Sequence, residues 1–249
     1  MPEHRCTMQD IIFISDLHLK PTNPETIELF IRFSEEIASQ ADTLYILGDL
    51  LEFWVGDDDP AEAYSDVFSS LSRLPEKFDT EVFLMHGNRD FLIGTQLAQR
   101  CGFEIIQDPH KISLQGKDAL LMHGDTLCTD DLDYQKFRKM VRDPLWQQQV
   151  LSRSLEERYQ LANNLRQDSQ QAMADKDDYI MDVNLQETQA TFDKYEVDLI
   201  IHGHTHRPAI HREKLGDRDT TRVVLGDWHD TTMYLRVNDT SELRLQSYP

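Results

Sequence analysis

Short apolar runs alternate with longer amphipathic segments along most of the chain. Two of the intervening segments, 26–40 and 61–74, carry apolar residues at close to helical spacing. The short runs are almost wholly apolar, a pattern typical of strands that are buried on both faces of a sheet. The alternation predicts an α/β fold. The five clearest strand runs are 11–15, 44–47, 82–85, 119–122 and 199–201.

Weaker patterns predict the remaining elements of that fold. We expect a short helix over 94–101, strands within 103–122 with a turn at Gly116, a helix over 181–195 and further strands from Arg222 onward.

Residues 131–175 break the alternation, because they carry helical spacing and no strand signal. They lie between two predicted strands and therefore predict an inserted helical cap on a core formed by 1–130 and 176–249. Such an insertion could pack only on itself, or it could cover a binding site with basic residues facing lipid head groups. Its basic residues are Lys136, Arg138, Lys139, Arg142, Arg153, Arg158 and Arg166.

Each of the five apolar runs ends in a polar cluster that is rich in metal-binding residue types. The carboxyl ends of neighbouring parallel strands deliver functional groups to one edge of a sheet. Any one of these clusters alone is a weak signal, but five at strand ends in one chain predict a shared site. The clusters read Asp-x-His at 16–18, Gly-Asp at 48–49, Gly-Asn-Arg-Asp at 87–90, His-Gly-Asp at 123–125 and Gly-His-Thr-His at 203–206.

The side chains in these clusters supply three oxygen donors and four imidazoles. This number exceeds the four ligands of a tetrahedral zinc site but suits two ions that share a bridging carboxylate, for which Asp49 is the best candidate. Gly48 would remove a side chain that otherwise crowds such a bridge. The candidate ligands are Asp16, His18, Asp49, Asn88, His123, His204 and His206.

The net charge limits the kinds of molecule that the protein surface can attract. The 249 residues carry a formal charge of −20, which argues against non-specific nucleic-acid binding and against attraction of the whole surface to an anionic membrane. No apolar run approaches the roughly 18 residues that span a bilayer, and the first ten residues lack a signal-peptide pattern. Three widely spaced cysteines give no metal or disulfide framework. We therefore expect a soluble or at most peripheral protein.

The polar clusters resemble the blocks of calcineurin-like metallophosphoesterases, in the same order, from residue 11 to about 230. The resemblance implies a four-layer α/β/β/α sandwich and two Mn²⁺ ions per chain. One ion would be held by Asp16, His18, Asp49 and His206, and the other by Asp49, Asn88, His123 and His204.

Longer stretches resemble one branch of that family, the UDP-2,3-diacylglucosamine diphosphatases of lipid A synthesis. They include 54–58, 86–92, 123–131, 180–184 and 202–208. The resemblance implies attack of a metal-activated hydroxide on the α-phosphorus of UDP-2,3-diacylglucosamine, giving UMP and 2,3-diacylglucosamine 1-phosphate. It also implies a cytoplasmic protein that is peripherally attached to the cytoplasmic face of the inner membrane, with a cap that shelters the acyl chains.

The same resemblance assigns residue roles. Arg89, Asp49 and His123 would be catalytic. At position 173, where relatives carry Asn, this chain has Met. The implied substrate contacts are Asn88, Arg89, Asp131, Ser169, Lys176 and His204.

Arg89 occupies a position where many members of the family have a histidine that can act as a general acid. Arginine is a poor proton donor because it is effectively always charged. A sugar phosphate leaves without such an acid, since its second pKa is near 6. Arg89 therefore fits diphosphate cleavage better than cleavage of an alcohol phosphomonoester.

Two alternatives remain open from the sequence. A soluble nucleotide-diphosphate hydrolase would use the same metals without needing an apolar cap. A scaffold that binds proteins through a metal-free fold is less consistent with the chain, because such scaffolds lose ligands and all seven positions are filled here.

Overall fold

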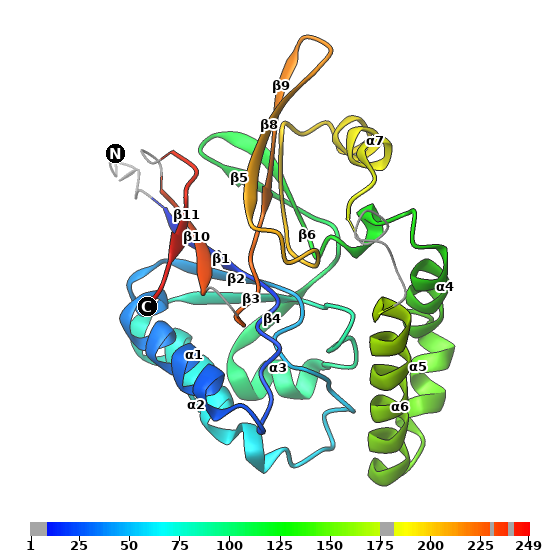
Figure 1. The fold of residues 1–249 in the computed structure, drawn as a ribbon. Helices are drawn as coiled ribbons and strands as arrows, with labels where there is room; N and C mark the ends of the chain where they lie inside the picture. Colours follow the sequence, from blue (N-terminus) through cyan, green and yellow to red (C-terminus); the bar gives the residue numbers. More distant parts are fainter. Residues whose placement is uncertain (1–8, 175–181, 230–231, 239–241) are drawn as a thin grey trace.

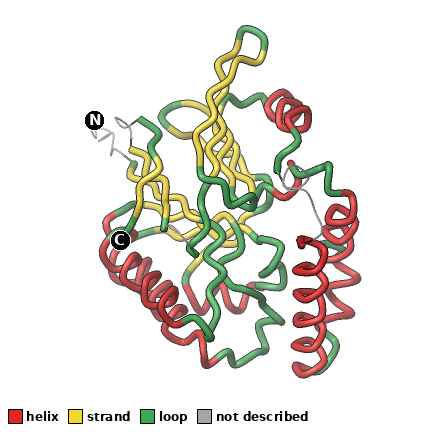
Figure 2. Tube along the Cα trace, in the orientation of Figure 1, coloured by secondary structure: helices red, strands yellow, loops and turns green. Residues whose placement is uncertain are grey.

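The fold was analysed in a computed structural model that describes residues 9–174, 182–229, 232–238 and 242–249 (Figure 1). Two β-sheets lie between layers of helices, and Figure 2 shows the strands gathered at the centre. The first sheet has the strand order β11-β10-β1-β2-β3-β4. Its strands are β1 Asp10–Ile14, β2 Thr43–Leu47, β3 Glu81–Met85, β4 Phe103–Ile106, β10 Met233–Asn238 and β11 Leu245–Ser247.

The second sheet has the order β5-β6-β7-β9-β8. In both sheets the strands that carry the polar clusters run parallel: β1 pairs with β2, β2 with β3, and β6 with β7. Their carboxyl ends therefore lie on a common edge within each sheet. The strands are β5 His110–Leu114, β6 Lys117–Met122, β7 Leu199–His202, β8 Ala209–Leu215 and β9 Arg218–Val224.

The helices fall into three groups in the described chain. Helices α1 (Pro24–Glu36), α2 (Ser65–Phe78) and α3 (Thr95–Cys101) cover the outer face of the first sheet, and α7 (Leu185–Tyr195) covers the second. Short 3₁₀ turns at 38–40, 62–64 and 125–127 connect elements. The third group, which lies beside the sheets, consists of α4 Leu132–Val141, α5 Pro144–Leu151 and α6 Leu155–Ala174.

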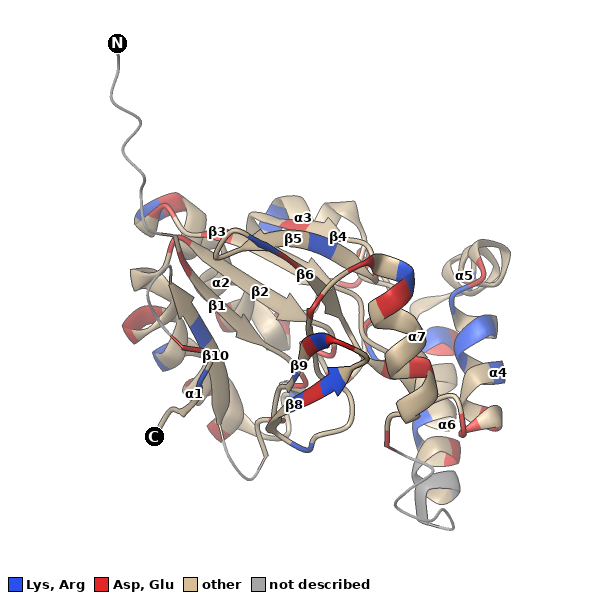
Figure 3. Cartoon of the chain, turned by 90° about the horizontal axis from the view of Figure 1, so that it is seen from above, with Lys and Arg blue, Asp and Glu red and all other residues tan. Residues whose placement is uncertain are grey.

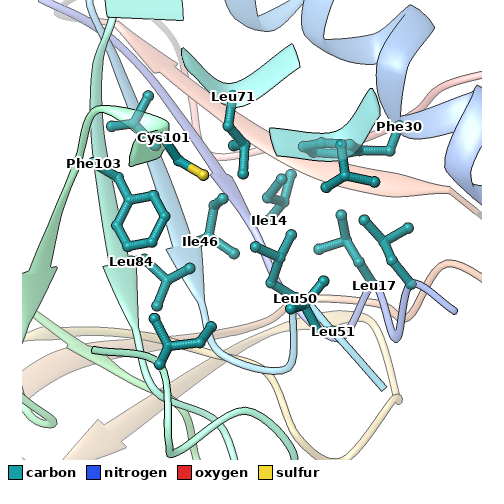
Figure 4. Close-up of a cluster of buried hydrophobic side chains, with 14 of the residues drawn as sticks. Ile14, Leu17, Phe30, Ile46, Leu50, Leu51, Leu71, Leu84, Cys101 and Phe103 are labelled. Carbon is teal, nitrogen blue, oxygen red and sulfur yellow. The ribbon is translucent and has the colours of Figure 1, made fainter. Parts of the chain in front are cut away.

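Three apolar clusters hold the layers together. Between the first sheet and its helices, Ile14, Ile46 and Leu84 from three strands face Phe30 and Leu71 (Figure 4). A second cluster fills the space between the sheets, and a third joins the second sheet to α7. Burial of this apolar surface is the main stabilising term. The predicted α/β/β/α sandwich is confirmed.

Most of the predicted elements are present within one to four residues of their expected ends. The turn at Gly116 lies between β5 and β6 with φ +73°. The pattern did not predict β8 or the start of β9, which form an antiparallel hairpin over 209–224. Exposed or half-buried polar positions dominate β8, so the hairpin lacks the apolar run that marks the other strands.

The cap helices pack on the core and not only on one another. Val141 and Val150 are 1% and 3% exposed and belong to the same apolar cluster as the first sheet. Arg158 of α6 is buried, donates to the carbonyl oxygen of Val55 at 2.6 Å and forms an ion pair with Asp58. The self-packing alternative is therefore wrong for this insertion.

The expectation that the cap's basic residues face lipid head groups is also wrong for four of them. Arg138, Arg142, Arg158 and Arg166 all reach acidic or carbonyl groups of the core. Figure 3 shows basic and acidic positions interspersed on α4, α6 and α7. In the described part of the chain, no helix combines the length and the apolar character needed to cross a bilayer.

Candidate metal centre and substrate cavity

All seven predicted ligand residues lie together where the carboxyl edges of the two sheets meet. The first sheet supplies Asp16 and His18 after β1, Asp49 after β2 and Asn88 after β3. The second sheet supplies His123 after β6, and His204 and His206 after β7. Packing of one sheet against the other therefore brings the two halves of the site together.

Asp16, His18 and His206 form the first group of candidate ligands. One possible ligand atom from each lies within 4.8 Å of the others. The Nε2 atoms of His18 and His206 are 3.3 Å apart, and His206 Nε2 lies 3.4 Å from Asp16 Oδ1. These nitrogen and oxygen atoms point into one small volume, as the ligands of a bound cation do.

Asp49 stands between this first group and a second one. Its Oδ2 atom lies 3.8 Å from His18 Nε2 and 3.9 Å from His123 Nε2. In the second group, Asn88 Oδ1 lies 3.0 Å from His123 Nε2 and 3.1 Å from His204 Nδ1. This placement is the one that a bridging carboxylate requires.

The donor set fits divalent cations. Asp16 Oδ1 is buried and accepts no hydrogen bond among the described residues, and its contact with a charged group is the one to His206 Nε2 at 3.4 Å. A buried carboxylate oxygen that accepts no hydrogen bond carries a desolvation cost, which a cation reduces. Carboxylate, amide and imidazole donors together suit Mn²⁺, Fe or Zn²⁺.

The pKa values of the site residues are also consistent with a cation-binding site. Burial raises the pKa of Asp49 to about 7 and lowers the pKa of His18 to about 3. For His123 and His206, burial lowers the pKa, but neighbouring carboxylates outweigh it and raise the values to about 9 and about 10. The buried carboxylates thus favour positive charge in their neighbourhood.

The backbone at the ligand positions adopts an unfavourable conformation. Five of the seven candidate ligands have positive φ angles, between 47° and 69°, although none of them is glycine. Such conformations are uncommon outside glycine and cluster at functional sites. The five residues are Asp16, His18, Asp49, His204 and His206.

Two glycines permit the close approach of the ligand segments. A Cβ atom on Gly48, which has φ +95°, would lie 2.5 Å from His123 Nδ1. A Cβ atom on Gly87 would lie 2.0 Å from Asp49 Oδ1. These contacts explain why glycine precedes Asp49 and Asn88 in the sequence.

Several supporting residues were not identified from the sequence. Asp90 accepts hydrogen bonds from the backbone N–H of Leu50 and of Gly87, both at 2.8 Å. Asp227 Oδ2 lies 3.2 Å from His206 Nδ1 and so orients that ring. Asp90 is part of the Gly-Asn-Arg-Asp cluster. Asp227 follows Gly226 directly after the apolar residues 223–225, as Asp49 follows Gly48 after 44–47, so both residues carried a signal at a strand end.

A cavity of about 500 Å³ opens beside the candidate ligands and extends under the cap. This volume lies within the range of small-molecule sites, about 300–1,000 Å³. One end is lined by the polar groups of the site. The other end is largely apolar and lies between core and cap, where its walls include Trp54, Phe91, Phe137, Trp146, Leu161 and Leu165.

The predicted substrate contacts also line this cavity, as far as the structure describes them. Asn88, Arg89, Asp131, Ser169 and His204 all lie in its wall. Lys176 lies outside the described residues, and so does the side chain of the residue at position 173.

Comparison with known proteins agrees with this geometry. A family model for calcineurin-like phosphoesterases matches residues 10–208. Proteins named UDP-2,3-diacylglucosamine hydrolase are similar over 91% of this chain: one from Stenotrophomonas maltophilia (47% identity, 94% of its own length), one from Hahella chejuensis (46%, 93%) and one from Xanthomonas campestris (48%, 94%).

We predict that Gly87→Ala weakens divalent-metal binding by about 10-fold or more, because the new methyl group must displace Asp49 from its position. Titration calorimetry of Mn²⁺ into the metal-free protein would measure this loss. Gly226→Ala is the matched control, since its Cβ would have no neighbour closer than 3.4 Å. Unchanged Mn²⁺ affinity in Gly87→Ala would contradict the close packing described above.

Proposed function

Because the chain belongs to the calcineurin-like phosphoesterase family, we propose that it hydrolyses the diphosphate bond of UDP-2,3-diacylglucosamine to UMP and 2,3-diacylglucosamine 1-phosphate. The observation that carries this proposal is the cavity that joins the candidate metal centre to an apolar space under the cap. A substrate with a diphosphate at one end and two acyl chains at the other matches both ends. The relatives that carry this substrate in their names cover nearly the whole chain.

The seven clustered residues would hold two Mn²⁺ ions. Asp16, His18 and His206 would bind one ion, Asn88, His123 and His204 the other, and Asp49 both, in accord with the distances within each group. Bound divalent ions supply an activated water nucleophile and neutralise charge on phosphoryl oxygens.

Arg89 would bind the phosphoryl oxygens of the substrate. Its backbone N–H donates to Asp49 Oδ1 at 2.8 Å, which fixes the residue beside the bridging position, and its side chain lines the cavity. A guanidinium group can donate two parallel hydrogen bonds to phosphate oxygens. It remains charged throughout the reaction, so the sugar phosphate leaves as an anion without protonation by this residue.

The cap, residues 131–175, would enclose the acyl chains against the core formed by 1–130 and 176–249. Aromatic and aliphatic side chains from both parts line the apolar end of the cavity. Asp131 and Ser169 would contact the polar part of the lipid from the cap side, together with Lys176. Removing acyl chains from water would supply much of the binding free energy, at about 25 cal/mol per Å² of apolar surface.

We place the protein in the cytoplasm, in peripheral contact with the cytoplasmic face of the inner membrane, where its lipid substrate lies. The net charge of −20 argues against a general electrostatic attraction to anionic lipid and to nucleic acid. Access to the substrate would therefore depend on the cavity and its rim.

We predict that the protein releases UMP from UDP-2,3-diacylglucosamine when Mn²⁺ is supplied, and that EDTA abolishes this activity. Chromatographic detection of UMP and of the lipid monophosphate would test both points. UDP-sugars that lack acyl chains serve as the control. Faster turnover of those soluble substrates would favour the alternative, a nucleotide-diphosphate hydrolase, and inactivity with Mn²⁺ on every substrate would contradict the proposal.

We predict that Arg89→Ala lowers kcat on the diacyl substrate by about 10²- to 10³-fold, since a charged donor to the phosphoryl oxygens is lost. Arg89→Lys should recover only part of the rate, because it keeps the charge without the bidentate geometry. Steady-state kinetics would measure both variants, with Arg212→Ala on the exposed part of β8 as the control. A rate for Arg89→Ala equal to that of the unchanged protein would rule out this role.

We predict that Leu165→Gln lowers kcat/KM for the diacyl substrate by about 10-fold or more, because a polar group enters the apolar wall of the cavity. The loss should be much larger than the loss on a small chromogenic phosphodiester. Leu145→Gln is the matched control, since Leu145 is 68% exposed on α5. Equal losses on both substrates would contradict acyl-chain binding under the cap.

A further inference from the structure

Arg142 connects the first cap helix to a segment that carries candidate metal ligands. Its Nη2 atom donates to the carbonyl oxygens of His86 and Gly87, each at 2.9 Å. These two carbonyls immediately precede Asn88, whose side-chain oxygen faces His123 and His204. A cap residue thus holds the backbone from which one candidate ligand projects.

Arg166 makes a comparable connection from the last cap helix. Its Nε atom lies 3.0 Å from Glu52 Oε1, and the other carboxylate oxygen of Glu52 lies 4.0 Å from His18 Nδ1. Glu52 is buried, with 8% exposure, whereas the side chain of Arg166 is 32% exposed. Glu52 therefore stands between the cap and a candidate ligand of the other ion.

A third connection reaches the segment after β6. Arg138 Nε donates to Asp125 Oδ2 at 2.8 Å, and the hydroxyl group of Tyr134 donates to the same oxygen at 2.9 Å. Asp125 is fully buried and follows His123 by two residues. Each ion position thus has at least one supporting contact from the cap.

We propose that cation binding and cap docking are thermodynamically coupled through Arg142 and Arg166, which act as positioning residues for the two metal sites. The inference rests on the proposed metal centre but not on the proposed substrate. When the cap is docked, the arginines restrict the segments that carry Asn88 and His18 to the geometry that binds the ions. By reciprocity, bound ions must stabilise the docked cap by the same factor.

The positive charge of the arginines makes the direction of the change in cation affinity informative. Each arginine is positive and lies near a cation site, so its removal would strengthen cation binding if charge repulsion were its only effect. Positioning predicts the opposite, because a loosened ligand segment binds the ion less well. The direction of the change in affinity therefore separates the two effects.

The test is calorimetric titration of Mn²⁺ into the metal-free full chain, without substrate. We expect Arg142→Ala and Arg166→Gln each to weaken Mn²⁺ binding by about 10-fold, as loss of groups that support metal ligands commonly does. Arg142→Lys keeps the charge and one donor and should show an intermediate affinity. Lys136→Ala, which removes the same charge from an exposed position on α4, should leave the affinity unchanged.

Hydrogen exchange provides a second measurement, made first on the unsubstituted protein and then on both variants. Amides of α4 to α6 should exchange more slowly with Mn²⁺ than with EDTA, and this difference should shrink in Arg142→Ala and Arg166→Gln. Unchanged or tighter Mn²⁺ binding in both variants, or cap exchange that is independent of Mn²⁺, would overturn the coupling. Failure of the unsubstituted protein to bind Mn²⁺ would overturn the metal centre as well, whereas Mn²⁺ binding without UMP release would remove only the proposed substrate.

Discussion

The burial of two carboxylates, Asp16 and Asp49, is the constraint on which the rest of the site depends. Their side chains are almost inaccessible to water, and a buried unpaired charge is strongly unfavourable. The chain compensates them with backbone donors: the N–H of His204 reaches Asp16 Oδ2 and the N–H of Arg89 reaches Asp49 Oδ1, both at 2.8 Å. Both acceptors, Asp16 and Asp49, have left-handed backbone conformations. The backbone donors compensate only part of the negative charge on the two carboxylates. Bound cations would compensate the rest.

Neither sheet could form this site alone. The carboxylates come from the first sheet, and three of the four imidazoles come from the second. An apolar cluster with members such as Phe13, Leu47, Leu121 and Ile201 fixes the separation of the sheets and therefore the distance between the two ligand sets. Close packing makes such a core resistant to small displacements. The apolar core between the sheets therefore affects function by setting the positions of the ligand residues at the edges of the two sheets.

The sequence predicted those features that depend on local pattern. Buried parallel strands leave continuous apolar runs, and the polar clusters at their ends identified all seven residues that the structure brings together. Local sequence pattern could not predict contacts between segments that are distant in the chain. Glu52 lies 34 residues from His18, and no local spacing marks it as a neighbour of that ring. Helical spacing likewise did not reveal that Arg142 and Arg158 turn toward the core.

The cap uses its polar and apolar residues for different purposes. Its core-facing arginines bind fixed acceptors of the core, such as Asp58 and the carbonyl of Gly87, and these contacts are directional. Its apolar residues line a cavity, and apolar contacts tolerate ligands of varied shape because they are not directional. An arginine that is held by a core carboxylate is not available to an anionic lipid surface. The four arginines held by the core therefore serve to position the cap, and only Lys136, Lys139 and Arg153 of its described basic residues are exposed.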